Sequence, residues 1–197
     1  MLKFDHERDN RLERKGKTIV IDVGPDQMGW TGRNGLADLL EAVGNCIDYA
    51  KIWAMNAASL PEPFIRSVVD LYKQADIATF GGGLLFEYAF LKNDVDGMIE
   101  LLQQRGIEGV EVSENYLILS RDERLKIIEK LADASLAVVY EFGRKQPDVP
   151  LSVEDFEQVV MEVKESGAHH VILEQSEFDL LDEVDSSATD SLFRQSW

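Results

Sequence analysis

The sequence predicts an α/β fold, specifically a TIM (β/α)8-type barrel of which about six βα units are present. Three observations support this. Short apolar runs rich in β-branched residues recur at intervals of roughly 30 residues, as parallel strands with crossover helices require. Amphipathic helical patterns lie between these runs. Ionisable residues end five of the six runs, and α/β barrels place catalytic groups at the C-terminal ends of their strands.

An open, doubly wound parallel sheet is the physical alternative. A complete barrel typically takes ~250 residues, and this chain has 197. A doubly wound sheet would concentrate its ionisable residues at one switch point. Here they follow nearly every strand, so we prefer the barrel, short by about two βα units.

The strands can be placed from the apolar runs. They are expected at residues 18–24, 46–52, 77–80, 109–113, 136–145 and 170–174. The ionisable residues at their ends are Asp22, Lys51, Glu111, Glu141 and Glu174. The third strand instead leads directly into the glycine run Gly81-Gly82-Gly83.

Helices are expected after each strand, bounded by start and stop signals. The expected helical segments are residues 36–43, a helix that starts at Pro61, residues 84–91, 94–105 and 120–132, and a helix that runs from Ser152 to Gly167. Ser120 and Glu123 have the spacing of a capping box. We assign residues 1–197 to one domain, with a polar N-terminal arm at 1–17 and an acidic segment at 175–197.

Composition and charge exclude several classes of protein. The net charge of −17 argues against non-specific nucleic-acid binding, which needs a basic surface. No apolar run approaches the ~20 residues of a membrane-spanning helix, and the charged N-terminus does not have the pattern of a signal peptide. The single cysteine, Cys46, cannot form an internal disulfide. We therefore expect a cytoplasmic protein without membrane or nucleic-acid partners.

The strand-end residues indicate chemistry on an anion. We predict that Asp22, Glu111, Glu141 and Glu174 bind Mg²⁺, which prefers oxygen ligands. Lys51 and Lys145, with Glu141, are the candidate catalytic groups. Gly81, Gly82, Gly83 and Arg144 are the candidate substrate-binding residues. The substrate would be a small phosphorylated or carboxylated molecule. The alternatives are structural: the glycines form a tight turn, Asp22 belongs to a turn, and Lys145 is a solvated loop residue.

Six stretches form a recognisable set: residues 16–24, 36–41 with 47–51, 82–89, 109–113, 140–145, and 167–168 with 171–174. In order and spacing over nearly the whole chain, they resemble the phosphosulfolactate synthase family. The resemblance implies a TIM-type barrel and the Mg²⁺-dependent addition of sulfite to phosphoenolpyruvate, a step towards coenzyme M. Relatives of this family also include plant heat-stress proteins.

The chain also departs from the pattern of that family. Val23 stands where a lysine is usual, and Gln175-Ser-Glu-Phe replaces a run that contains arginine. Two hypotheses follow: a phosphosulfolactate-synthase-like lyase, or a divergent relative that no longer catalyses and acts as a binding or stress-related protein. A six-stranded arc would expose two strand edges. We therefore expect either that the segment after Glu174 covers the gap or that the chain forms a homo-oligomer through it.

Overall fold

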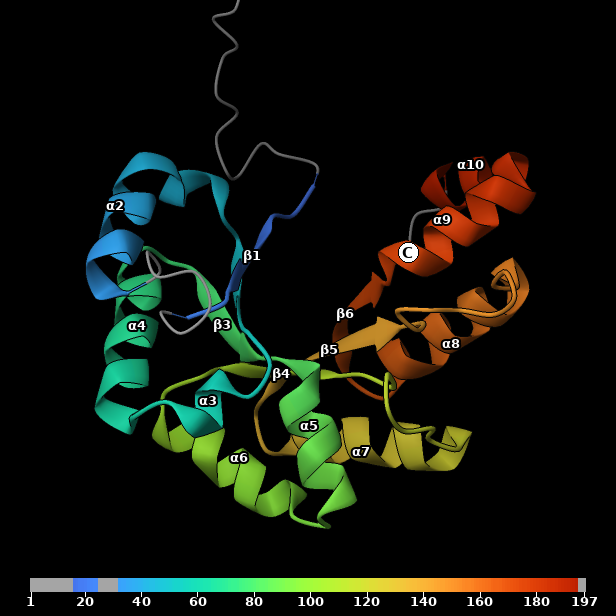
Figure 1. The fold of residues 1–197 in the computed structure, drawn as a ribbon. Helices are drawn as coiled ribbons and strands as arrows, with labels where there is room; N and C mark the ends of the chain where they lie inside the picture. The colour runs from blue at the N-terminus through green and yellow to red at the C-terminus, as the bar shows by residue number, and fades with distance from the viewer. Residues whose placement is uncertain (1–15, 25–31, 195–197) are drawn as a thin grey trace, which may run out of the picture.

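The computed structural model describes residues 16–24 and 32–194, in which six parallel strands curl into a half-barrel (Figure 1). Each strand pairs with the next in sequence, in the order β1-β2-β3-β4-β5-β6. The strands are β1 (Ile19–Asp22), β2 (Tyr49–Ile52), β3 (Ala78–Gly81), β4 (Gly109–Val112), β5 (Ala137–Phe142) and β6 (Ala168–Leu173). The prediction of an incomplete TIM-type barrel is confirmed.

Helices lie on the outside of the curl (Figure 1). They are α2 (Arg33–Val43), α3 (Asn56–Ser59), α4 (Glu62–Gln74), α5 (Gly83–Leu91), α6 (Val95–Gln104), α7 (Arg121–Asp133), α8 (Val153–Glu165), α9 (Gln175–Val184) and α10 (Ser186–Arg194). The capping box predicted for α7 is present. Ser120 Oγ accepts from the N–H of Glu123 at 3.3 Å, and Glu123 Oε2 accepts from the N–H of Ser120 at 2.9 Å.

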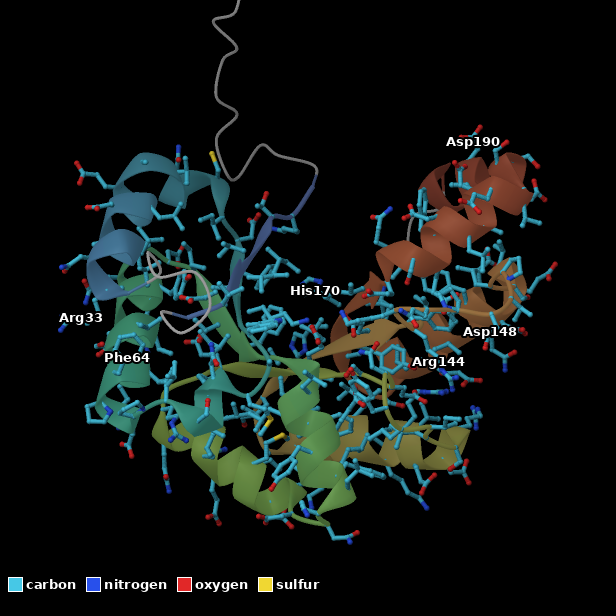
Figure 2. All side chains as sticks on the ribbon, viewed as in Figure 1. Arg33, Phe64, Arg144, Asp148, His170 and Asp190 are labelled. Carbon is cyan, nitrogen blue, oxygen red and sulfur yellow. The ribbon has the colours of Figure 1, made fainter. Side chains whose placement is uncertain are left out.

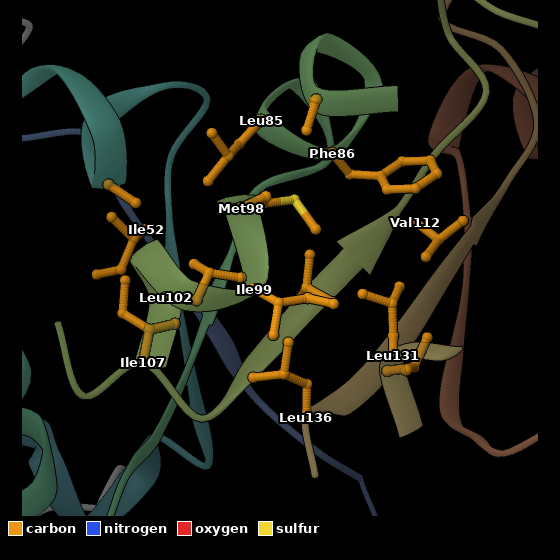
Figure 3. Packing of buried hydrophobic residues seen from close by; sticks show 14 of the residues in the cluster. Ile52, Leu85, Phe86, Met98, Ile99, Leu102, Ile107, Val112, Leu131 and Leu136 are labelled. Atoms are coloured by element: carbon orange, nitrogen blue, oxygen red, sulfur yellow. The ribbon is translucent and has the colours of Figure 1, made fainter. Parts of the chain in front are cut away.

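The main core lies between the sheet and this outer layer of helices. Figure 3 shows Met98, Ile99 and Leu102 of α6 packed in one cluster with Leu131 of α7 and Val112 of β4. All four residues of β4 are buried, as expected for a parallel strand covered on both faces. The core therefore fixes the strands from outside and leaves their C-terminal ends to form a common rim.

The two edges of the sheet are β1 and β6. Ile19 and Ile21 of β1 are 37% and 53% exposed, which is unusual for apolar strand residues. Helices α9 and α10 pack against α8 and β6 through a second, smaller apolar cluster made by Phe156, Val160, Leu181 and Leu192. They continue the outer layer beyond β6 and do not add a strand to either edge of the described sheet. Closure of the gap by a second copy of the chain stays a prediction.

Some predicted boundaries were wrong. Residues 44–46 form a 3₁₀ turn, so the second strand begins at Tyr49 and Cys46 lies outside it. The last strand begins at Ala168 and so includes both His169 and His170. Helix α10 was not predicted. The predicted arm lies outside the described residues except for Gly16 and Lys17, and the division of the chain into one domain stays a prediction. No helix in the described part has the length and apolarity needed to cross a bilayer.

Candidate active site at the C-terminal rim

A lysine joins two carboxylates at the C-terminal rim of the half-barrel. Lys51 Nζ of β2 lies 2.6 Å from Glu111 Oε2 of β4 and 3.8 Å from Glu141 Oε1 of β5. The three side chains are 15%, 2% and 6% exposed, so the cluster is largely shielded from water. Three of the residues predicted from strand ends therefore do meet. They meet as an ammonium held between two carboxylates.

The proton affinity of Glu111 is changed by its burial and by neighbouring charged groups. Burial raises the pKa of its carboxyl, the Lys51 ammonium lowers it, and the charge of Glu141 raises it again. The net direction is upward, and Glu111 Oε1 also accepts a hydrogen bond from the N–H of Gly83 at 2.9 Å. A carboxyl with a raised pKa, 2.6 Å from an ammonium, is well placed to exchange a proton with it.

Glu141 has a second partner that the sequence analysis missed. Asn115, in the loop between β4 and α7, donates from Nδ2 to Glu141 Oε2 at 2.9 Å. Asn115 is not among the site residues that the sequence predicted. A short amide side chain four residues after a strand-end glutamate was the available signal, since side chains at that distance can reach the same rim.

A small cavity of about 50 Å³ lies beside this cluster. Among the residues that line it are Lys51, Gly83, Glu111, Asn115, Glu141 and Lys145. A drug-sized ligand usually occupies ~300–1,000 Å³, so a substrate would extend from this cavity to the open side. There, Lys145 is 65% exposed.

Asp22 lies apart from the lysine cluster. Its carboxylate accepts from Tyr72 Oη at 3.0 Å and from the N–H of Gly24 at 3.0 Å, and it is 6% exposed. Burial raises the pKa of Asp22, although both hydrogen bonds act to lower it. In this structure, Asp22 links the end of β1 to α4.

Glu174 and Lys145 form a separate, more exposed pair. Lys145 Nζ lies 3.6 Å from Oε1 of Glu174, and Glu174 is the residue that precedes α9. The neighbouring Arg144 is exposed, and its backbone is fixed by α9: its N–H donates to Glu177 Oε1 at 2.9 Å and its carbonyl accepts from Ser176 Oγ at 2.6 Å. The loop after β5 thus presents two basic side chains at the rim.

The glycine run does not form an open loop. Gly81 ends β3, and a Cβ there would lie 3.0 Å from Leu102 of α6. The N–H of Gly82 donates to the carbonyl of Ile52 at 3.0 Å, and that of Gly83 donates to Glu111. Both N–H groups therefore bind protein acceptors here. The predicted role of these glycines in substrate binding stays a prediction.

The four predicted magnesium ligands are not gathered at one point. Among the described residues, no group of three or more His, Cys, Asp or Glu side chains is arranged to hold a metal ion. The two carboxylates that do converge already share the Lys51 ammonium, which occupies the position where a cation would be attracted. These residues do not fit a resident four-carboxylate Mg²⁺ site, and the role of Asp22 and Glu174 as ligands stays a prediction.

The sequence matches the family model of (2R)-phospho-3-sulfolactate synthase (ComA) over residues 6–194. The chain belongs to the phosphosulfolactate synthase family. The phosphosulfolactate synthase of Methanocaldococcus jannaschii is 29% identical over 167 residues, covering 83% of this chain and 64% of that protein. The phosphosulfolactate synthase of Bacillus subtilis is 28% identical over 174 residues, covering 86% of this chain and 65% of that protein. The chain therefore spans just under two thirds of the length of these relatives.

Solved structures support the fold assignment. The carboxyl transferase domain of Rhizobium etli pyruvate carboxylase aligns with a TM-score of 0.54 at 14% sequence identity. The alignment covers 88% of this chain and 31% of that one. At this identity the likeness shows a shared barrel architecture and nothing about the reaction.

Proposed function

We propose that this member of the phosphosulfolactate synthase family adds sulfite to phosphoenolpyruvate, to give phospho-3-sulfolactate. The observation that supports this most directly is the Lys51 ammonium, held between Glu111 and Glu141 beside a small cavity at the rim. An ammonium in this position can donate a proton to a substrate that lies over the cavity. The family match supports this choice of reaction class.

The proposed step is a nucleophilic addition followed by protonation. The sulfur lone pair of sulfite forms a bond to C3 of phosphoenolpyruvate, and the π electrons of the C2=C3 bond move towards C2 and its carboxylate. Lys51 donates a proton to C2, and the C–O bond to phosphate stays intact. No oxidant is needed. Lys51 is then reprotonated by a proton from solvent that the Glu111 carboxylate, 2.6 Å from its Nζ, can relay.

The substrate anions would be held at the open side of the cavity. The Lys145 ammonium is 65% exposed and Arg144 is exposed beside it, so both can contact phosphate or sulfite. We assign the phosphate to this loop, because the N–H groups of Gly82 and Gly83 already have protein acceptors. The charge of the two basic side chains would also attract anions to a molecule that is otherwise strongly acidic.

Magnesium is proposed to enter with the substrate. Mg²⁺ is commonly held by one or two carboxylates together with substrate phosphates, and it keeps several water ligands. In that mode the substrate anions would supply most of the non-water ligands, so the ion would not need to displace Lys51 from between Glu111 and Glu141. No step of the proposed reaction depends on a resident ion.

The direct test is to follow phosphoenolpyruvate by ³¹P NMR in the presence of sulfite and Mg²⁺. We expect the enol phosphate signal to be replaced by that of an alkyl phosphate, with a carbon–sulfur bond detected by mass spectrometry. Circular dichroism would establish that the sample is folded. A folded protein that leaves phosphoenolpyruvate unchanged would rule out this activity for the chain.

A second candidate function has an observation in its favour. Glu141 and Glu174 both lie within ion-pair distance of lysines, 3.8 Å from Lys51 and 3.6 Å from Lys145. A non-catalytic binding relative would have such neutralised carboxylates. It would show no rise in melting temperature with phosphoenolpyruvate and Mg²⁺, whereas the enzyme would be stabilised by substrate binding.

A further inference from the structure

A buried carboxyl group on α5 holds the loop that follows β4. Glu87 is 2% exposed, in the second turn of α5. It accepts three hydrogen bonds, all from this loop: from Ser113 Oγ, from the N–H of Asn115 at 3.1 Å and from the N–H of Tyr116 at 2.7 Å. Three bonds from one buried side chain fix the path of residues 113–116.

This loop presents one side chain to the lysine cluster. Asn115 Nδ2 donates to Glu141 Oε2 at 2.9 Å, while Asn115 Oδ1 is buried and has no hydrogen-bond partner among the described residues. The orientation of the amide therefore depends on its bond to Glu141 and on the position of the Asn115 backbone. Glu87 fixes that backbone position.

The first residue of α5 acts on the other carboxylate. The N–H of Gly83 donates to Glu111 Oε1 at 2.9 Å, and a Cβ at Gly83 would lie 2.8 Å from that oxygen. Figure 1 shows α5 beginning beside β4. One short helix thus orients both carboxylates that flank Lys51, Glu111 directly and Glu141 through Asn115.

We propose that Glu87 is a positioning residue for proton donation by Lys51, acting through Asn115 on Glu141. This inference rests on the proposed function, and it assigns a role to a residue that does not line the cavity and so does not touch substrate. The competing interpretation is that Glu87 only stabilises the loop. The two interpretations differ in whether the effects of Glu87 and Asn115 on kcat are coupled.

A double-mutant cycle measures that coupling, with phosphoenolpyruvate and sulfite as substrates. Glu87→Gln keeps the side-chain size but leaves one acceptor oxygen, so at least one loop donor loses its partner. We expect Glu87→Gln and Asn115→Ala each to lower kcat by roughly tenfold to a hundredfold, with KM of Glu87→Gln within about twofold. The double variant should be no slower than Asn115→Ala alone. Effects that multiply, or a loss confined to KM, would overturn the proposal.

Asp48→Asn is the matched control. Asp48 is also a buried carboxylate, 8% exposed, and it accepts from the N–H of Thr18 at 2.8 Å, but it precedes β2 at the opposite rim. The Asp48→Asn substitution should lower the melting temperature and leave kcat unchanged. If Glu87→Gln does not fold, Ser113→Ala removes one of the three bonds and should lower kcat by a smaller factor in the same direction.

A readout without substrate separates this inference from the proposed function. The ¹H–¹⁵N signals of the Asn115 side-chain amide report its bond to Glu141 directly. We expect Glu87→Gln and Glu141→Gln to shift these signals, and Asp48→Asn to leave them in place. If the wild type does not turn over phosphoenolpyruvate, the proposed function fails while this experiment still tests the positioning. Unshifted signals in Glu87→Gln would refute the link from Glu87 to Glu141.

Discussion

Tyr49 and His170 share a hydrogen bond of 2.8 Å between Tyr49 Oη and His170 Nε2, although they are 121 residues apart in sequence. Their rings meet edge to face with centroids 5.0 Å apart. Tyr49 begins β2 and His170 lies in β6, so the contact spans the inside of the curl near its N-terminal end. Figure 2 shows His170 between β6 and the first strands of the sheet. The half-barrel therefore has a direct link between strands that are not neighbours in the sheet.

The first prediction concerns the pH dependence of this link. Burial lowers the pKa of His170, with smaller effects from the nearby charges of His169, Lys17 and Lys164. A lowered pKa means that the unfolded chain takes up a proton more readily than the folded one. The contribution of neutral His170 to the free energy of unfolding is therefore fully present above the ordinary pKa of about 6.5. It is lost as the pH falls through the pKa of His170 in the folded state.

We expect His170→Gln to make the melting temperature less dependent on pH in this range. The difference in melting temperature between wild type and variant should shrink between pH 7.5 and the folded-state pKa. His169→Gln is the control, because His169 is the adjacent histidine and is exposed. A difference that stays constant from about pH 8 to pH 5 would contradict the prediction.

The second prediction tests Lys51 as the proton donor. Lys51→Met should lower kcat by roughly 10²–10⁴-fold, the range typical for loss of a general acid. Lys17→Met removes an ion-paired lysine from the opposite rim, where Lys17 Nζ lies 3.4 Å from Asp48 Oδ1, and should leave kcat unchanged. Steady-state kinetics measures both. Equal kcat values for Lys51→Met and wild type would exclude Lys51 from the chemical step.

The third prediction concerns the close approach of α5 to β4. In Gly83→Ala the new Cβ would lie 2.6 Å from Ser113 Cβ and 2.8 Å from Glu111 Oε1, so both residues must move. We expect a loss of about 1–3 kcal/mol in the free energy of unfolding, measured by urea denaturation. Gly44→Ala, where a Cβ would make only ordinary contacts of 3.6 Å, should not show this loss. An unchanged urea midpoint in Gly83→Ala would show that this contact is loose.

The fourth prediction concerns magnesium. Because Lys51 already occupies the space between the two converging carboxylates, Mg²⁺ alone should not change the melting temperature. Mg²⁺ with phosphoenolpyruvate should raise it, since a ligand that binds only the folded state stabilises it. A clear rise with Mg²⁺ alone, abolished in Asp22→Asn or Glu174→Gln, would instead support the four-carboxylate site predicted from the sequence.

Much of the fold could be predicted from the sequence, because its signals are local. The six apolar runs, the helices between them and the capping box at Ser120 all depend on residues close together in the chain. The errors arose where packing overrode a local pattern. Cys46 begins an apolar run but belongs to a 3₁₀ turn. Helix α10 lies in a Ser-rich segment, and it is held by the packing of Leu192 into the cluster that α8 and α9 form.

The site was predictable in part. The periodic strand ends identified Lys51, Glu111 and Glu141 as residues of one rim, and these do meet. Sequence position could not show which carboxylate each lysine would neutralise, because that depends on side-chain reach across the sheet. It also could not show Asn115, whose partner lies 26 residues away and is reached only when the loop follows the path that α5 imposes.

The strict strand order has a consequence for how this chain folds. Every strand of the described sheet pairs only with its neighbours in sequence, so this sheet can grow one βα unit at a time as the polypeptide is synthesised. The bond between Tyr49 and His170 is different, because it closes a loop of 121 residues and must await the last strand. Conservative substitutions at this pair should therefore speed unfolding and leave the folding rate nearly unchanged, with φ-values close to zero.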